Sequence, residues 1–347
     1  MNLLKKKESK KTEQEKIAER REEILAKGRK FKYPLQWTRH RIVINTILIA
    51  VIVFALIITG GWLALYRLGM TDDLLFKVTE IIPVPVASVD SKNVRFSDYL
   101  MFYRSSMTSI ERQSGSQFDS SSFEQLSNEY KRSALTEAET YAYALKLADE
   151  LDITVSDEEI ENEFNRHLKT GGIDRSEEGF VKIIADNFGL TKDEYNRMLY
   201  LTLVKAKVEI AIDENANDVA SKVEQLLSEN GNSFKGVADT LGAAVIYEET
   251  GGHVDNKNID GGRATEATKL EPDQSSGKFV SMNGDGYYFV KLIKKTDAEV
   301  NFVSIKVPFT EFAKRFSTLQ EEGKISEYIT IKDPNLVESA IEEPVGP

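Results

Sequence analysis

Residues 148–160 read ADELDITVSDEEI, and this stretch places the end of one helix close to the start of the next. Apolar residues recur at helical spacing from Phe123 to Leu151, which predicts a long helix over that range. Ser156 and Glu159 then form a capping box, in which the two side chains satisfy free amides at a helix N-terminus. The stretch therefore predicts two successive helices.

The same signals continue towards the C-terminus. An apolar stripe from Phe180 to Phe188 predicts a further helix, which Gly189 can terminate. Thr191 and Glu194 make a second capping box, and the helix that it opens is expected to run from Lys192 to about Val208. Because each helix carries an apolar stripe, this part of the chain is predicted to be a packed helical domain.

Towards the N-terminus, the pattern predicts a linker, a strand and one more helix. Two prolines close a linker over residues 67–83, Val86–Val89 is typical of a strand, and residues 91–93 are expected to turn. Ser97 can cap the next helix. A Ser/Gly-rich loop at 114–122 separates this helix from the long one.

Several of these motifs resemble one known group of proteins. VASVDSKNV at 86–94 resembles the opening strand and turn of the SurA/PrsA/PpiD group of extracytoplasmic foldases. ADELDITVSDEEI looks like that group's hallmark phrase, and FGLTKDEYNRML at 188–199 is similar to its next helix. The motifs occur in the family's order over about residues 80–210. The resemblance implies a SurA-N-like helical chaperone domain.

Beyond the helical domain, the pattern becomes mixed α/β. Helices are expected around residues 219–227 and 233–241, followed by a strand at 245–247. Strands at 279–282 and 287–293 flank the sequence NGDG, a good hairpin signal. The fold class expected for the whole chain is therefore α+β.

The order of these elements resembles a parvulin-type prolyl isomerase domain. FKGVA at 234–238, the Gly-Gly pair at 251–252 and LEPDQSSGKFVSMNGDGYYFVKL at 270–292 stand where that family has similar phrases. The segment between residues 252 and 270 departs from the family pattern and is short. The resemblance implies a proline-binding cleft, and the candidate substrate-binding residues are Phe234, His253, Phe279 and Tyr288.

The catalytic groups of such a domain are missing from the sequence. Isomerisation of a peptide bond has a barrier of about 18–20 kcal/mol, and parvulins place paired histidines and a Cys or Asp at the twisted amide. Tyr288 stands at one histidine position, and the strand expected at 207–212 contains no histidine. The chain has no Cys, which also excludes disulfides and thiolate nucleophiles. No catalytic residue is assigned, and binding without efficient catalysis is expected.

The three histidines of the chain have different surroundings. His40 flanks an apolar run and is expected at an interface, whereas His167 lies on a polar helix and is expected to be exposed. His253 follows two glycines, so it either lines a cleft or is an ordinary loop histidine. Scattered histidines match no metal-ligand spacing and no Gly-rich phosphate loop is present, so neither a metal nor a cofactor is expected.

The run from Ile42 to Tyr66 contains no charged residue. As a helix it would be about 37 Å long, against about 30 Å of bilayer hydrocarbon. Trp37 precedes the run, and Trp62 and Tyr66 close it, as interfacial aromatic residues do. A cleaved signal peptide would have a shorter apolar core and a small-residue cleavage site. An uncleaved transmembrane helix is therefore expected.

Charge is divided unevenly about this run. Residues 1–41 hold 14 Lys/Arg and 6 Asp/Glu, a net of +8, so with −11 for the whole chain the remainder carries −19. The positive-inside rule places residues 1–41 in the cytoplasm and residues 67–347 outside the cytoplasmic (inner) membrane. The basic tail is either a solvated helix or coil, or a segment attracted to anionic lipid. The acidic body argues against nucleic acid as a ligand.

The C-terminal part is expected to form a strand at 300–307 and a helix at 309–319, which the SurA-like resemblance implies complete the helical domain. The expected segments are a cytoplasmic basic tail at 1–41, a transmembrane helix at 42–66, a linker at 67–83, a SurA-N-like helical domain at 84–212, a parvulin-like domain at 213–298, a C-terminal strand and helix at 299–333, and a tail at 334–347.

The leading interpretation is a membrane-tethered extracytoplasmic chaperone or foldase that binds unfolded or nascent secreted and envelope polypeptides. Two alternatives remain open: an active parvulin-type peptidyl-prolyl isomerase with an altered site, and a structural adaptor of an envelope complex. Catalysis on an X-Pro peptide separates the isomerase from the chaperone. Suppression of client aggregation separates the chaperone from the adaptor.

Overall fold

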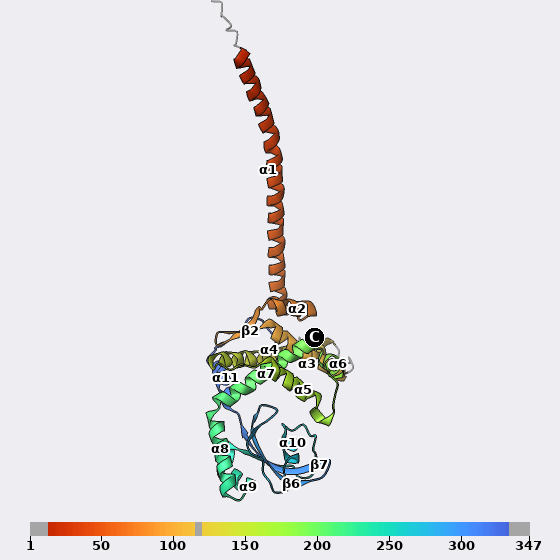
Figure 1. Cartoon of the computed structure of the whole chain (residues 1–347), viewed down its shortest axis with the longest axis vertical. Coiled ribbons are helices and arrows are strands. Elements are labelled where there is room, and N and C mark those ends of the chain that lie inside the picture. Colours follow the sequence, from red (N-terminus) through yellow and green to blue (C-terminus); the bar gives the residue numbers. More distant parts are fainter. Residues whose placement is uncertain (1–12, 115–119, 333–347) are drawn as a thin grey trace, which may run out of the picture. The chain divides into compact units, whose positions relative to one another are not determined.

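The structure is a computed structural model that describes residues 13–114 and 120–332 (Figure 1), without the side chains of residues 29–39, 113–114 and 120–121. The basic segment 1–12, the Trp37 side chain, most of the loop expected at 114–122 and the tail at 334–347 lie outside the described residues. The chain divides into two compact units, residues 1–64 and 65–347.

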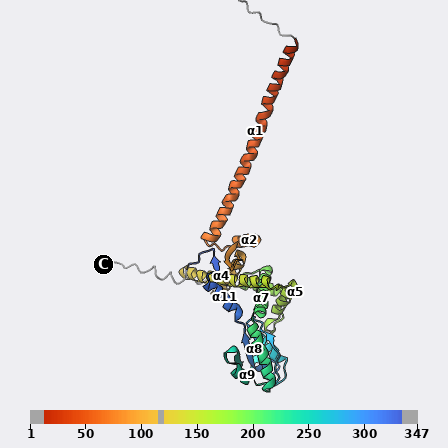
Figure 2. The ribbon, with the colours of Figure 1, turned by 90° about the vertical axis from the view of Figure 1, so that its left-hand side faces the viewer.

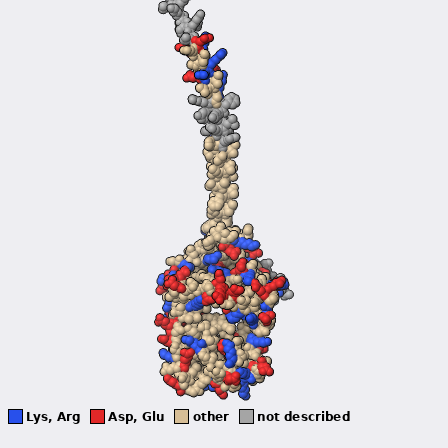
Figure 3. Space-filling view, viewed as in Figure 1, with Lys and Arg blue, Asp and Glu red and all other residues tan. Residues whose placement is uncertain are grey.

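Helix α1 (Glu13–Trp62) runs without a break through the expected tail and the apolar run, and a π-helical turn, Leu63–Arg67, follows it. The hydroxyls of Thr46 and Thr59 donate to carbonyls four residues earlier at 2.8 Å, so the helix itself satisfies them. The segment His40–Arg67 is long and apolar enough to cross a membrane. Between Arg41 and Arg67 this stretch holds no Lys, Arg, Asp or Glu, and Figure 3 shows its surface in tan.

The segment expected to be a linker, 67–83, contains helix α2 (Asp73–Ile81). Phe76 and Thr79 are 5% and 1% exposed, because this side of α2 packs against helix α3 (Phe96–Ser114). The linker expectation is corrected for these residues. Their fold depends on a contact with α3 that the local pattern does not show.

The larger unit contains a three-stranded antiparallel sheet in the order β2-β1-β8. The strand expected at 86–89 is confirmed. The turn after it lies at Asp90 and Ser91, both of which have a positive φ, rather than at residues 91–93, because Lys92 already pairs with Val89. The three strands are β1 (Pro85–Val89), β2 (Lys92–Arg95) and β8 (Ile325–Glu327).

Helix α3 begins at Phe96, directly after β2, so the expectation that Ser97 caps it is wrong. The Phe96 amide donates to the Val84 carbonyl at 2.9 Å, which satisfies one of the amides that a cap would serve. Ser97 is 5% exposed within the first turn, and its hydroxyl has no partner among the described residues. The strand leads the chain into the helix without a capping residue.

The remaining helices of this region follow the sequence pattern. Both expected capping boxes are confirmed, at Ser156–Glu159 and Thr191–Glu194. Gly189 ends a helix with a φ of 62°, which favours glycine. The helices are α4 (Ser120–Glu150), α5 (Asp157–Leu168), α6 (Glu177–Phe188) and α7 (Lys192–Ile212), with a short 3₁₀ turn at Thr170–Gly172.

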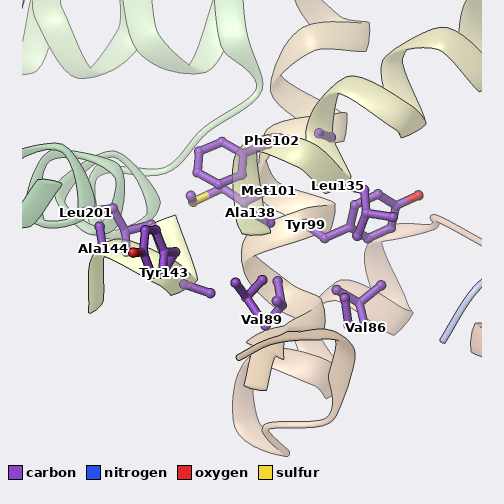
Figure 4. Packing of buried hydrophobic residues seen from close by; sticks show 14 of the residues in the cluster. Val86, Val89, Tyr99, Met101, Phe102, Leu135, Ala138, Tyr143, Ala144 and Leu201 are labelled. Carbon is purple, nitrogen blue, oxygen red and sulfur yellow. The ribbon is translucent and has the colours of Figure 1, made fainter. Parts of the chain in front are cut away.

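The strands and helices of this region share one apolar core (Figure 4). Val86 and Val89 of β1 lie in the same cluster as Tyr99 of α3, Leu135 of α4 and Leu201 of α7, and all five are at most 2% exposed. The sheet is therefore part of the helical region and not a separate element.

Helix α7 continues through residues 207–212, which were expected to form a strand. The sequence KVEIAI alternates polar and apolar residues at its start, which is typical of a strand. Val208 and Ile212 are nevertheless four residues apart on the buried side of a helix, and are 0% and 8% exposed in the helical core. Packing against that core decides the structure here, and the strand prediction is wrong.

Residues 214–308 form an antiparallel sheet with helices on both faces (Figure 1). The strand order is β3-β7-β6-β5, and β4 also pairs with β7. The expected hairpin is confirmed, since Phe279 pairs with Tyr288. The elements are α8 (Glu214–Glu229), α9 (Phe234–Leu241), a 3₁₀ turn at Gly242–Ala244, β3 (Ile246–Glu249), β4 (Val254–Asp255), α10 (Arg263–Thr268), β5 (Phe279–Val280), β6 (Gly286–Lys295) and β7 (Glu299–Pro308).

The two faces of this sheet have separate cores. Helices α8 and α9 cover the face that carries Tyr287 and Phe289, whereas α10 covers the face that carries Val290 and Phe302. Figure 1 shows α8 and α10 on either side of β6 and β7, and Figure 2 shows α8 and α9 from a second direction. Successive residues of β6 therefore serve different faces.

Strand β7 is central to this sheet, between β3 and β6. The sequence analysis assigned residues 299–333 to the helical domain, but only the part after Pro308 joins it. The correction has a packing reason: Ile305 is 0% exposed in the core under α8 and α9, and Phe302 is 3% exposed in the core under α10. The α/β region is therefore an insertion into the helical region.

Helix α11 (Glu311–Glu321) and β8 lie in the helical region. The rings of Phe312 and Phe316 have centroids 5.2 and 5.9 Å from that of Tyr143 on α4. Strand β8 pairs with β1, and its Glu327 forms an ion pair with Arg132 at 2.6 Å. These elements complete the core that β1 and α3 begin.

Candidate functional site

Tyr288 lies on β6 on the α10 face of the sheet, where it is 4% exposed. Phe279, its partner on β5, stacks on it with ring centroids 6.1 Å apart. The Arg263 guanidinium lies 5.2 Å and the Lys306 ammonium 5.6 Å from the centre of the Tyr288 ring. The structure thus brings together two of the four predicted residues, Tyr288 and Phe279, in a packed cluster beside two cations.

Asp285 adds a negative charge to this cluster. Its carboxylate accepts from Lys306 Nζ at 2.5 Å and, more weakly, from the Tyr288 hydroxyl at 3.4 Å. Burial raises the pKa of Asp285, but the hydrogen bond and charge of Lys306 and the hydrogen bonds from Ser281 and the backbone together outweigh burial, so the pKa lies below its usual value. Burial and the charge of Asp285 together raise the pKa of the Tyr288 phenol.

The chemistry of the cluster follows from these ionisation states. A carboxylate, an ammonium and a neutral phenol can position a polar group by hydrogen bonds. None of the three titrates near neutral pH, which an imidazole does. The cluster can therefore bind, but it does not supply the acid–base group that the missing histidines would supply.

Phe234 and His253 lie away from this cluster. Phe234 is 3% exposed in the core beneath α8 and α9, on the opposite face of the sheet from Tyr288. The His253 side chain is 39% exposed in the connection between β3 and β4, with Nδ1 4.0 Å from the Glu299 carboxylate. His253 is therefore an ordinary loop histidine, and it is not part of the Tyr288 cluster.

Several hollows lie on the α/β region, and two of them are lined by predicted residues or by residues of the Tyr288 cluster. Phe234, Gly251 and Gly252 contribute to the lining of a hollow of about 540 Å³, so the glycine pair does meet the predicted phenylalanine. A second hollow of about 200 Å³, on the α10 face, is lined in part by Arg263 and Ser304. Residues of β7 line both of these hollows, although this strand was expected to belong to the helical domain.

The residues that sequence reasoning missed come from separated segments. Arg263 opens α10 and Lys306 lies on β7, and neither stands in a motif. Their approach to Tyr288 depends on the position of β7 beside β6, which no local pattern in the sequence encodes. Asp285 was identified only as part of the hairpin turn, and no signal in the turn assigns it a partner.

The remaining histidines do not add a site. His167 is half-buried, not exposed as expected, because its Nδ1 lies 2.5 Å from the Tyr195 hydroxyl and its Nε2 3.2 Å from Glu163. His40 is exposed on α1. Among the described residues, no group of three or more His, Asp or Glu side chains could hold a metal ion.

Exposed apolar side chains occur on both regions of the larger unit. Ile183 and Phe188 of α6 are each 40% exposed. On the α/β region, Ile259 and Met282 are 73% and 49% exposed, and the Met282 amide donates to the Gly261 carbonyl at 3.0 Å. Such side chains can contact apolar segments of another polypeptide.

Comparison with known proteins places the helical region in a family. Residues 35–209 match the family described as SurA-like N-terminal domain, a range that covers half of the chain. The chain therefore belongs to the family of proteins that carry this domain. The match includes the apolar run and ends within α7, so the α/β region lies outside it. No curated protein and no solved structure matches the chain.

Proposed function

We propose that the protein is a membrane-tethered extracytoplasmic chaperone that binds unfolded or nascent secreted and envelope polypeptides. The observation that carries the proposal is the SurA-like N-terminal domain at residues 35–209, a domain of chaperone-type extracytoplasmic foldases. The same matched range contains the apolar segment His40–Arg67. The simplest interpretation of a SurA-like domain together with this apolar segment is a chaperone with a membrane anchor.

The proposed anchor has one orientation. Basic residues are concentrated before the apolar segment, where residues 1–41 carry a net of +8, from 14 Lys/Arg and 6 Asp/Glu. The positive-inside rule then assigns the N-terminus to the cytoplasm and the larger unit to the outside of the cytoplasmic membrane. Contact of the basic tail with anionic lipid belongs to the same proposal.

Client binding is proposed to use exposed apolar side chains and to need no cofactor. Burial of client side chains stabilises such a complex by about 25 cal/mol per Å² of apolar surface. The pairs Ile183/Phe188 and Ile259/Met282 are the candidate contacts, because all four are exposed without being part of a core. Each pair can be replaced with little effect on the fold.

The experiment uses the full chain in phosphatidylcholine vesicles and a reduced, permanently unfolded model protein. We expect the chain to suppress aggregation of that protein, and the double change Ile183→Ser/Phe188→Ser or Ile259→Ser/Met282→Ser to weaken suppression several-fold. Phe123→Ser is the matched control, since Phe123 is also 40% exposed. Absence of suppression by the unchanged chain would overturn the proposal and favour an adaptor role.

A prolyl isomerase with an altered site is the second candidate, favoured by the Tyr288 cluster. The phenol lies near Arg263 and Lys306, and its hydroxyl can hydrogen-bond a twisted amide. Catalysis requires stronger binding of the twisted state than of the planar state. Because the phenol is buried against Phe279, the proposal is binding without efficient catalysis.

A further inference from the structure

Helix α2 (Asp73–Ile81) has one side in the folded unit and one side that none of the described elements covers. On the inner side, Phe76 is buried beneath the Arg104 guanidinium, which lies 4.4 Å from the ring centre. The same Arg104 pairs with Asp73 at 3.1 Å. Asp72 caps the helix by accepting from the Leu75 amide at 3.3 Å. The helix is therefore fixed in its rotation about its own axis.

The other side of α2 carries a stripe of exposed apolar residues. Leu74, Val78 and Ile81 are 71%, 41% and 83% exposed, and their spacing of four and three residues places them on one face. Ile82 continues the stripe at 56% exposure. Ile81 is the most exposed large apolar side chain among the described residues. A soluble surface rarely carries such a stripe without a partner.

The chain connection indicates the partner. Leu65 and Tyr66, the last residues of the apolar run, are tied to the folded unit: Leu65 is 6% exposed in its core, and the Tyr66 hydroxyl donates to the Pro85 carbonyl at 2.7 Å. Between Arg67 and Asp73 the chain can extend by at most about 20 Å. If the apolar run spans a bilayer, α2 must begin within that distance of the membrane surface.

We propose that α2 is an interfacial helix whose stripe, Leu74, Val78 and Ile81, inserts between the lipid headgroups of the outer leaflet. Amphipathic helices bind membranes in this way, with the apolar face at the boundary between headgroups and acyl chains. Lys77 borders the stripe and can extend its ammonium towards the headgroups. The inference rests on the proposed anchor, and it adds that the folded unit is held against the bilayer in a defined orientation.

The absence of Cys from the chain permits a direct test. Single variants Leu74→Cys, Val78→Cys and Ile81→Cys of the full chain are spin-labelled and reconstituted in phosphatidylcholine vesicles. The accessibility of each label to oxygen and to a water-soluble nickel chelate is measured by electron paramagnetic resonance. Glu80→Cys is the matched control on the polar side of α2, and Ile259→Cys is the control on the α/β region. Thermal melting checks that every variant is folded.

We expect the three stripe labels to be several-fold more accessible to oxygen than to nickel, and the two controls to show the opposite. A Val53→Cys label in the middle of the apolar run reports the anchor separately. If Val53 favours oxygen but the stripe favours nickel, or is reached by neither reagent, the α2 proposal is overturned alone. If Val53 favours nickel, the anchor is overturned, and the α2 proposal with it.

Discussion

Asp213 connects the two places where the chain crosses between the helical and α/β regions. Its side chain is 1% exposed and accepts from the Ala216 amide at 2.9 Å, in the first turn of α8. It also accepts from the Thr310 and Glu311 amides at 2.7 and 3.0 Å, where α11 begins. One carboxylate therefore caps both helices.

Replacement of Asp213 by Ala should destabilise the protein by about 2–4 kcal/mol, because three amides at helix N-termini lose their acceptor. Asp213→Asn keeps one acceptor oxygen and should lose less. Chemical denaturation of the full chain in detergent measures both. Equal losses for the two variants would show that the negative charge, and not the number of acceptors, stabilises the crossing.

Glu139 of α4 is a second buried carboxyl, 3% exposed. Burial and the charge of Glu327 raise its pKa to about 7, although Arg132 acts in the opposite direction. Because the pKa of Glu139 is higher in the folded protein than in the unfolded chain, ionisation of Glu139 lowers the free energy of unfolding. This loss of stability develops as the pH rises from the ordinary value of 4.5 through about 7.

Glu139→Gln should therefore stabilise the protein relative to the unchanged chain by about 2–3 kcal/mol at pH 8, and by little at pH 4.5. Denaturation curves at both pH values measure the difference. Glu129→Gln, an exposed site on the same helix, is the control. A stability gain that does not depend on pH would contradict the assigned ionisation.

At the scale of single elements, sequence patterns correctly predicted the helix ends that depend only on residues close together in the sequence. The capping boxes at Ser156 and Thr191 and the left-handed Gly189 are local devices, and the structure has all three. Elements that depend on distant contacts were missed. Helix α2 needs α3, and residues 207–212 alternate like a strand but join a helix because Val208 meets the helical core.

The same distinction explains the candidate site. The hairpin signal predicted two paired strands at 279–282 and 287–293, and in the structure Phe279 pairs with Tyr288. Arg263 and Lys306 reach Tyr288 only because β7 lies beside β6. Phe234 and His253 were grouped with Tyr288 on a family resemblance, and the alternation of faces along the sheet separates Phe234 from it.

Helix α11 provides a prediction at this scale. Phe312 packs against Tyr143 and is 4% exposed, so Phe312→Ala should destabilise the helical region by about 3–5 kcal/mol. Phe123→Ala, at an exposed site on α4, should have little effect. Hydrogen exchange by mass spectrometry locates the loss. Faster exchange confined to residues 214–308 would contradict the packing of α11 on α4.

For the whole molecule, the first prediction concerns catalysis. X-Pro exchange takes about 10–100 s at 25 °C without a catalyst, so even modest acceleration is detectable. The full chain should leave the exchange rate of an X-Pro peptide unchanged within a factor of about two, because the pKa shifts of Asp285, Lys306 and Tyr288 all lead away from neutral pH. A large acceleration that Tyr288→Phe abolishes would establish the isomerase instead.

The second prediction concerns topology. Protease added to intact spheroplasts should digest the chain beyond Arg67 and leave the basic N-terminal segment intact, because the charge bias places that segment in the cytoplasm. Antibodies against tags at the two ends distinguish the fragments. Loss of the N-terminal tag alone would reverse the orientation.

Strand β8 pairs with β1, so residue 327 lies beside residue 87 in the finished sheet. During export, segments that leave the membrane early can fold before later ones arrive. Here β1 leaves the membrane first, but its partner β8 is almost the last described element to follow. The core that contains β1 is incomplete until α11 and β8 have also been exported. In the proposed topology, the SurA-like domain is for that interval an incompletely folded polypeptide outside the cytoplasm. The protein is then an unfolded polypeptide like its proposed clients. A copy that has already folded in the same membrane could therefore bind it as a chaperone.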